Sequence, residues 1–256
     1  MVNFELVIIT VFGLIIGSFL NVCIYRLPRE KNIVVPSSSC VICGEAIKPY
    51  DNIPLISFLI LKGKCRACGA KISWRYPFVE LLNSFFYLLA YTRFGLSFEL
   101  IPIFLFLSTM IVITFIDLDF QIIPDSITLP GILIGIAFSS FLFPDPFELN
   151  SITGFINSLI GFIIGGGLFF LIALLSKGGM GGGDIKMMAM IGAFFGWKGV
   201  LTTTLIASLV GSVVGISLVL FKGKNRKTAI PFGPFLALGS VITLFGGHFI
   251  LKVYLG

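Results

Sequence analysis

Four aspartates in this sequence are unusual because they lie within or beside long apolar stretches. A carboxylate at the centre of a membrane span costs about 2.5–3.5 kcal/mol on insertion scales, so such a residue is a functional candidate. Two carboxylates held close together share a proton, which lets one act as a general base on water while the other protonates a peptide carbonyl. The four residues are Asp117, Asp119, Asp125 and Asp184.

Helix caps are the main competing interpretation of these aspartates. Asp184 follows a glycine-rich run, 178–183, and an aspartate at that place can simply cap a helix. The same glycines also permit extended backbone close to a substrate. Asp125 fits a turn or a cap, and Asp119 fits an interfacial charge paired with a lysine. On spacing alone, a catalytic pair, helix caps and the ion site of a transporter all stay open.

Four cysteines in the polar segment 25–76 form two CxxC pairs with 21 residues between them. Such pairs are typical of a tetrahedral zinc site with four thiolate ligands. Gly44 and Gly69 follow the second cysteine of each pair and fit tight turns. Because thiolates would fill all four positions, we expect a structural metal rather than a catalytic one. Cys23, inside the first apolar stretch, is expected to pack. The expected ligands are Cys40, Cys43, Cys65 and Cys68.

The composition is that of a membrane protein. Hydrophobic residues make up 57% of the 256 residues and charged residues 12%, with a mean hydropathy of +1.06, whereas an ordinary soluble domain carries about 25% charged residues. We therefore expect an all-α polytopic membrane protein of about eight transmembrane helices with a small cytoplasmic zinc-binding loop domain. The first stretch lacks the leading positive charge of a signal peptide and is expected to be retained. The expected spans are about 4–24, 77–92, 98–117, 126–143, 152–175, 185–197, 200–221 and 231–253.

This pattern predicts that the chain has three parts. Residues 1–24 form the first transmembrane helix, 25–76 the cytoplasmic four-cysteine domain, and 77–256 a multi-helix membrane domain that carries the aspartates. The second and sixth spans are short, and the count of the sixth and seventh stays open.

Lys and Arg residues cluster between the expected spans, and their asymmetry sets the orientation. With 25–76 in the cytoplasm, Asp117 ends a span running inward and Asp184 begins one running outward, so both lie near the cytoplasmic face. This distribution also accounts for the net charge of +6 without a nucleic-acid partner. Beyond 25–76, the basic residues placed inside are Lys177, Lys186, Lys222, Lys224, Arg226 and Lys227. Those placed outside are Arg93, Lys198 and Lys252.

Six motifs follow one another along nearly the whole chain. They are Gly17–Val22 with Tyr25–Pro28, the two CxxC pairs with Asp51–Pro54 between them, Ser73–Glu80, Asp117–Asp119 with Ile123–Asp125 and Leu129–Pro130, Gly181–Lys186, and Pro231–Ala237. In this order they resemble the motifs of the bacterial type IV prepilin peptidases, which are bifunctional leader peptidase/N-methyltransferases of the GxGD aspartyl protease class. The specificity of the match comes from the order of the motifs.

The resemblance implies a catalytic dyad of Asp117 and Asp184. It implies a substrate, a prepilin or pseudopilin with a short basic leader, cut at the cytoplasmic face of a bacterial plasma (inner) membrane. It further implies methylation of the new N-terminus with S-adenosylmethionine. The resemblance does not identify the residues for that step; the polar segment and Glu80 are the candidates, because an acidic group can hold the substrate ammonium. Which aspartate is acid or base, the residues that bind the methyl donor and the oligomeric state stay open. The supporting residues are Asp119, Asp125, Gly181, Gly183, Lys186 and Glu80.

Two other classes of function compete with a protease. A cation-coupled transporter would use the same aspartates but is expected to place its charges near the membrane midplane. A binding or scaffold protein built around the zinc loop would not require the aspartates at all. His248 falls in the last expected span towards the outer face, and we expect it to pack rather than to act in catalysis.

Overall fold

The computed structural model describes residues 4–148, 150–176, 179–222 and 230–255. Five residues used above, in the orientation argument and in the glycine run, lie outside the described residues. They are Lys177, Gly178, Lys224, Arg226 and Lys227.

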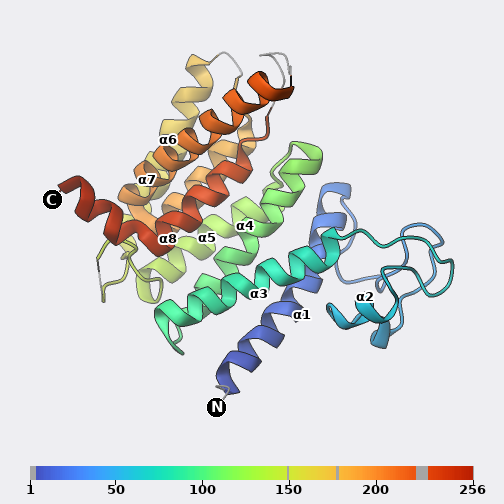
Figure 1. Cartoon of the computed structure of the whole chain (residues 1–256). Helices are drawn as coiled ribbons and strands as arrows, with labels where there is room; N and C mark the ends of the chain where they lie inside the picture. The colour runs from blue at the N-terminus through green and yellow to red at the C-terminus, as the bar shows by residue number, and fades with distance from the viewer. Residues whose placement is uncertain (1–3, 149, 177–178, 223–229, 256) are drawn as a thin grey trace. The chain divides into compact units, whose positions relative to one another are not determined.

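The described ranges are helical and contain no named strand. Seven long helices make up most of the chain, with one short helix and two 3₁₀ turns in the polar segment (Figure 1). The long helices are α1 (Phe4–Arg26), α3 (Arg75–Phe94), α4 (Leu100–Phe120), α5 (Asp125–Phe141), α6 (Phe155–Leu175), α7 (Gly182–Lys222) and α8 (Gly233–Leu255). The short elements are α2 (Ile56–Ile60) and the 3₁₀ turns Leu27–Arg29 and Pro49–Asp51.

Five helices are long and apolar enough to cross a membrane, among the residues that the structure describes. They are α1, α4, α6, α7 and α8, and they make the chain a multi-pass membrane protein. The expected sixth and seventh spans both fall within α7, which consists of two helical segments that meet at the non-helical residue Gly196. At the kink, Gly196 has a φ of 69°, the left-handed region that favours glycine.

The chain divides into two compact units, Met1–Val112 and Ile113–Gly256. In the first, α1 packs against α3 through side chains that bond to the main chain of α1. The Asn83 amide donates to the Gly13 carbonyl at 2.8 Å, and the Ser84 hydroxyl donates to the Thr10 carbonyl at 3.0 Å. These buried bonds fix the register of the two helices.

The polar segment of the first unit is built on two similar turns, each of which holds one CxxC pair. In the first turn, Cys40 receives the Gly44 N–H on its carbonyl and donates its own N–H to Glu45. Cys65 makes the same two bonds with Gly69 and Ala70 in the second turn. Gly44 and Gly69 have φ values of 75° and 70°, which a side chain would strain.

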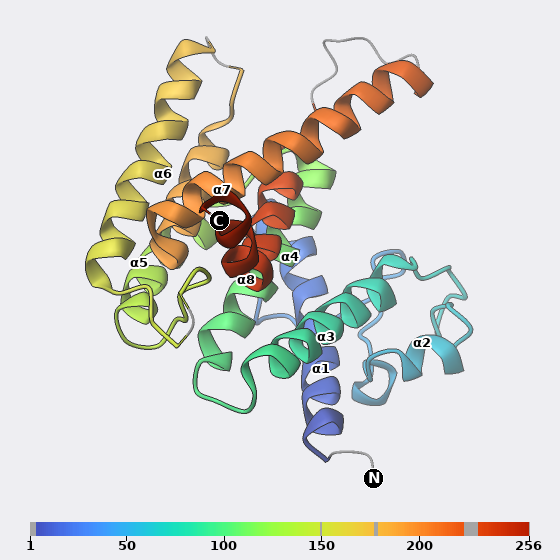
Figure 2. The same ribbon diagram turned by 60° about the vertical axis from the view of Figure 1, so that its left-hand side comes forward.

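The second unit is organised around α7, which contacts α5, α6 and α8. In Figure 2, α6 runs beside the first part of α7. Their backbones touch at a pair of glycines: a Cβ on Gly161 would lie 2.2 Å from the Gly192 carbonyl oxygen, and one on Gly192 would lie 2.1 Å from that of Gly161. Small residues at such a crossing let two membrane helices approach closely.

The Gly161–Gly192 crossing predicts a strong effect of added volume. Gly161→Val would insert a side chain where backbone atoms already touch, and we expect it to lower the free energy of unfolding by at least about 1–3 kcal/mol. Gly167→Val is the matched control in the same helix, because a Cβ there meets nothing within 4 Å. Thermal unfolding in detergent measures both, and equal melting temperatures for the two variants would contradict this packing.

Candidate active site

Asp117 lies in the last turn of α4, and its side chain is buried in the second unit with 5% of the residue exposed. A carboxylate buried among apolar helices requires a compensating partner. The partner comes from far along the chain: the Gly233 N–H donates to Asp117 Oδ2 at 2.9 Å. Gly233 is the first residue of α8, so its N–H is one of those that the helix itself leaves unpaired.

Asp184 lies in the first turn of α7 and is half-buried. Its N–H donates to the Gly181 carbonyl at 3.2 Å, within the glycine-rich run. The Asp117 carboxylate lies close enough for its charge to act on the Asp184 carboxyl group. The fold therefore brings together two aspartates that are separated by 67 positions in the sequence.

Ile123 joins the three segments that surround these carboxylates. It follows α4 and is buried. A Cβ on Gly183 would lie 2.8 Å from the Ile123 Cβ, and one on Gly233 would lie 3.2 Å from the Ile123 Cδ1 and 2.7 Å from Asp117 Oδ2. Glycine is therefore required at both positions, because any side chain would displace Ile123 or the carboxylate.

Asp125 and Lys186, two of the supporting residues, form an ion pair. The Lys186 ammonium lies 2.6 Å from both carboxylate oxygens of Asp125. Asp125 is in the first turn of α5 and Lys186 is two residues beyond Asp184, so the pair ties the two aspartate motifs together. Both side chains are substantially exposed, and such a pair adds little stability in water. Asp119 is exposed at the end of α4.

Glu80 belongs to the first unit and has two partners there. Its Oε2 accepts the Leu55 N–H at 2.9 Å, and the Ser18 side chain hydrogen bonds to the same carboxylate. The residue is buried in α3. Glu80 thus connects α1, α3 and the polar segment.

The four predicted cysteine ligands form one cluster. All four Sγ atoms lie within 4.8 Å of one another, and Cys40 and Cys68 are 3.9 Å apart. Sulfurs placed tetrahedrally about 2.3 Å from a zinc ion would be about 3.8 Å apart. The cluster can therefore hold a metal ion.

An ion pair holds the two halves of this loop together. Arg66 donates through Nε and Nη2 to the two oxygens of Asp51, at 2.8 and 2.7 Å. The Arg66 guanidinium lowers the pKa of the Asp51 carboxyl below its usual value. Asp51 precedes the second CxxC pair and Arg66 lies within it, so this contact positions the pair.

His248 and Cys23, which the sequence predicted to pack rather than to react, both have packing contacts. The His248 ring contacts the Phe147 carbonyl through Nδ1 at 3.0 Å, and Cys23 is buried in α1.

Sequence reasoning gave no role to Gly233 or Ile123. Gly233 was visible only as part of the Pro231–Ala237 motif, and nothing in local spacing pairs it with Asp117, 116 positions away. Ile123 looks like any apolar residue before a proline. A possible signal for Gly233 is its place between Pro231 and Pro234, which marks the start of a helix with a free N–H.

Two carboxylates near enough to interact electrostatically, one of them held by a main-chain N–H, are suited to acid–base hydrolysis. The pair can carry a single shared proton, so that one group removes a proton from water while the other donates to the scissile carbonyl. The pair titrates as a unit, and the two roles are not assigned to individual residues.

Two family models match most of the chain. The bacterial peptidase A24 N-terminal domain matches residues 11–94, and the type IV leader peptidase family matches residues 104–216. No solved structure matches.

Curated relatives carry the name prepilin leader peptidase/N-methyltransferase. One from Legionella pneumophila is 37% identical, with 99% of this chain and 95% of that protein covered. One from Pseudomonas aeruginosa is 35% identical, with 95% and 91% covered. One from Myxococcus xanthus is 41% identical over 221 residues, and the match covers 85% of this chain but only 64% of that protein.

The cysteine cluster predicts a stoichiometric metal. Purified protein is expected to contain about one zinc ion per chain, and Cys43→Ala is expected to lose most of it because three thiolates leave the tetrahedron incomplete. Cys23→Ala is the control, since Cys23 lies in α1 outside the cluster. Elemental analysis measures the metal content. Wild-type protein that carries disulfides and no zinc would contradict the prediction.

Proposed function

The chain belongs to the type IV leader peptidase family, and from this premise we propose that it is a membrane aspartyl endopeptidase that removes the short basic leader of type IV prepilins or pseudopilins. The observation that supports the proposal is the proximity of Asp117 and Asp184, near enough for their charges to interact, within a chain whose relatives are named prepilin leader peptidases. A transporter or a scaffold does not require two interacting carboxylates at these helix ends.

In the proposed reaction, the two aspartates act on a water molecule and the scissile peptide together. One carboxylate takes a proton from the water as it attacks the carbonyl carbon, and the other gives its proton to the carbonyl oxygen. The Gly233 N–H holds one oxygen of Asp117, so that the carboxylate keeps a single orientation during the reaction. The tetrahedral intermediate then breaks the peptide bond, and the amine leaves with a proton returned from the pair.

The glycines before Asp184 support a mode of substrate binding. Gly181 and Gly182 are exposed and add no side-chain bulk next to the carboxylates. We propose that an extended scissile segment pairs with this backbone in the manner of an added strand. The apolar helix that follows the leader in the substrate would remain in the bilayer.

The finer membrane arrangement is also a proposal. Eight crossings result if α7 is counted as two segments that meet at Gly196 and if α3 and α5 also cross. The excess of Lys and Arg then places the 25–76 domain and both aspartates on the cytoplasmic side of a bacterial plasma membrane. Residues 77–256 would form the peptidase domain.

We propose two cofactors, each with a separate role. Zinc, held by Cys40, Cys43, Cys65 and Cys68, would order the polar segment and leave no site for substrate, because four thiolates complete its coordination.

The second cofactor, S-adenosylmethionine, supplies an electrophilic methyl group when bound. In that second activity the new N-terminal amine would gain the methyl group and lose a proton, while the S–CH₃ bond of the sulfonium breaks and a neutral thioether leaves. A direct role for Glu80 toward the substrate ammonium stays a prediction.

Loss of either aspartate tests the proposal. Asp117→Asn and Asp184→Asn are each expected to lower the rate of prepilin cleavage by at least about 10²-fold, because an amide can neither accept nor donate the shared proton. Asp145→Asn is the matched control: it lies in the loop after α5, and its Oδ1 accepts the Phe147 N–H, which an amide oxygen can also do. The assay uses full-length protein in lipid with a prepilin. Cleavage at the wild-type rate in either dyad variant would refute the mechanism.

The Gly233–Asp117 bond predicts a second, distinct effect. In Gly233→Ala the new Cβ would press on Asp117 Oδ2, so we expect kcat for cleavage to fall about tenfold or more with little change in KM. Gly246→Ala in the same helix is the control, because the nearest atom to a Cβ there is 4.0 Å away. An effect confined to KM would show that Gly233 serves substrate binding rather than the orientation of Asp117.

A further inference from the structure

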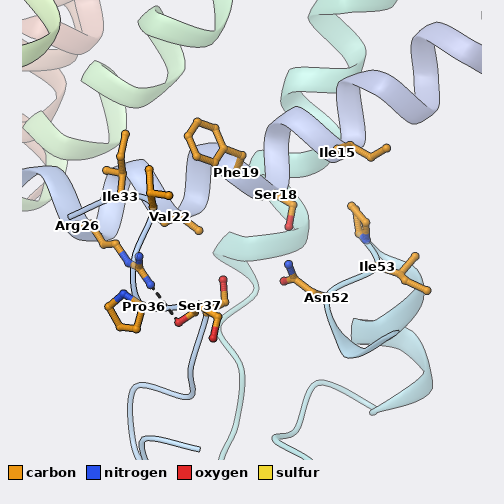
Figure 3. Close-up of a pocket in the computed structure, with 13 residues that line it drawn as sticks. Ile15, Ser18, Phe19, Val22, Arg26, Ile33, Pro36, Ser37, Asn52 and Ile53 are labelled. Carbon is orange, nitrogen blue, oxygen red and sulfur yellow. Dashed lines mark hydrogen bonds between the residues drawn. The ribbon is translucent and has the colours of Figure 1, made fainter. Parts of the chain in front are cut away.

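A cavity of about 640 Å³ opens in the first unit, between α1 and the polar segment (Figure 3). One wall is the second half of α1, from Ile15 to Arg26. The other walls are the segments 33–38 and 52–54, which flank the first CxxC pair on either side. The volume lies within the range of about 300–1,000 Å³ that small-molecule sites occupy.

The walls of the cavity differ in chemistry. Ile15, Phe19 and Val22 give it an apolar side on α1. Ser18 and Asn52 point their polar ends toward one another in Figure 3. A pocket that is mostly apolar with a few directed polar groups is typical of a site for an organic cofactor rather than for an ion.

Arg26 adds a positive charge at one end of the cavity. Its guanidinium donates to the Ser37 carbonyl at 3.2 Å (Figure 3) and to the Asn32 carbonyl at 3.0 Å, and these bonds fix its position. Both acceptors are neutral main-chain oxygens, so the charge of Arg26 is not cancelled by them and can bind an anionic group.

The residues around this cavity belong to motifs that the hydrolytic site does not use. Ser18 and Phe19 come from the first-helix motif, and Asn52 and Ile53 from the Asp51–Pro54 motif. Both proposed catalytic aspartates lie in the second unit. A second activity that transfers a methyl group needs a site for its donor, and the hydrolytic residues supply none.

We propose that this cavity binds S-adenosylmethionine, an inference that rests on the methyl-transfer part of the proposed function. The donor has an adenine ring, a ribose with two hydroxyls and an amino-acid end with a carboxylate. The apolar side of α1 suits the adenine, with Phe19 as a surface for the ring. Ser18 and Asn52 suit the ribose hydroxyls, and Arg26 suits the carboxylate.

Glu80 connects the walls of this cavity to α3 through hydrogen bonds. The Ser18 side chain, which lines the cavity, hydrogen bonds to the Glu80 carboxylate behind the wall. The carboxylate also accepts the Leu55 N–H, next to the Asn52–Pro54 wall. Glu80 thereby positions Ser18 and the wall segment, and it is a positioning residue for the site.

The experiment measures binding of tritium-labelled S-adenosylmethionine to the full-length protein in lipid nanodiscs by equilibrium dialysis. Ile53→Trp would fill the cavity, and we expect it to weaken binding about tenfold or more. Ile60→Trp is the matched control in the same segment, because Ile60 is 68% exposed and does not line the cavity, whereas Ile53 is 45% exposed and does. The control is expected to bind like the wild type.

A second variant, Asn52→Leu, tests the site without adding volume, and prepilin cleavage checks that each variant folds. Asn52→Leu keeps a similar volume at an exposed position and removes both polar groups, and we expect it to weaken donor binding as well. Prepilin cleavage is expected to be unchanged in all three variants, which shows that they fold. Loss of donor binding with intact cleavage supports the site, even if the aspartate variants should disprove the proposed peptidase mechanism.

Two results would overturn the proposal. One is wild-type affinity for the donor in both Ile53→Trp and Asn52→Leu, which is also expected if the cavity holds a lipid acyl chain instead. The other is an absence of donor binding to wild-type protein that cleaves prepilin at a normal rate.

Discussion

The burial of the Asp117 carboxylate is the constraint on which the second unit depends. A charged or proton-sharing group among apolar helices must have a polar partner, and water is largely excluded there. The partner is the first N–H of α8, which the helix cannot use itself. Because that bond joins the end of α4 to the start of α8, the position of α8 is fixed by the same group that is proposed to carry out the reaction.

Small residues make this arrangement possible. Gly233 and Gly183 both leave room for Ile123, and Gly161 and Gly192 let α6 and α7 touch along their backbones. A lipid environment gives little hydrophobic drive between helices, so association depends on close packing and on bonds such as that from Ser158 to the Ala193 carbonyl. The glycines are therefore part of what holds the carboxylates at one place, and not only a source of flexibility before Asp184.

The polar segment of the first unit is ordered by interactions other than helix packing. Its polar segment is small and has few buried apolar residues, so its order depends on the cysteine cluster, the Asp51–Arg66 pair and main-chain turns. These fix the walls of the cavity beside α1. The two proposed activities thus rest on separate units, one ordered by helix packing and the other by a cysteine cluster that can hold a metal ion.

The sequence by itself determined the membrane class and the family, and it predicted the four cysteine ligands and the two aspartates, because apolar length, CxxC spacing and the resemblance are all local or ordered along the chain. The cysteine cluster forms as the spacing predicted, and the all-helical class is confirmed, whereas the count of eight crossings is not. Hydropathy divided the region of α7 between residues 197 and 200, and the structure places the break at Gly196. Only the tertiary structure decided that Gly233 holds Asp117, that Ile123 fills the space between two glycines, and that Ser18 and Asn52 share a cavity. Those contacts join segments far apart in the sequence, and their geometry depends on how helices pack, which no local pattern records.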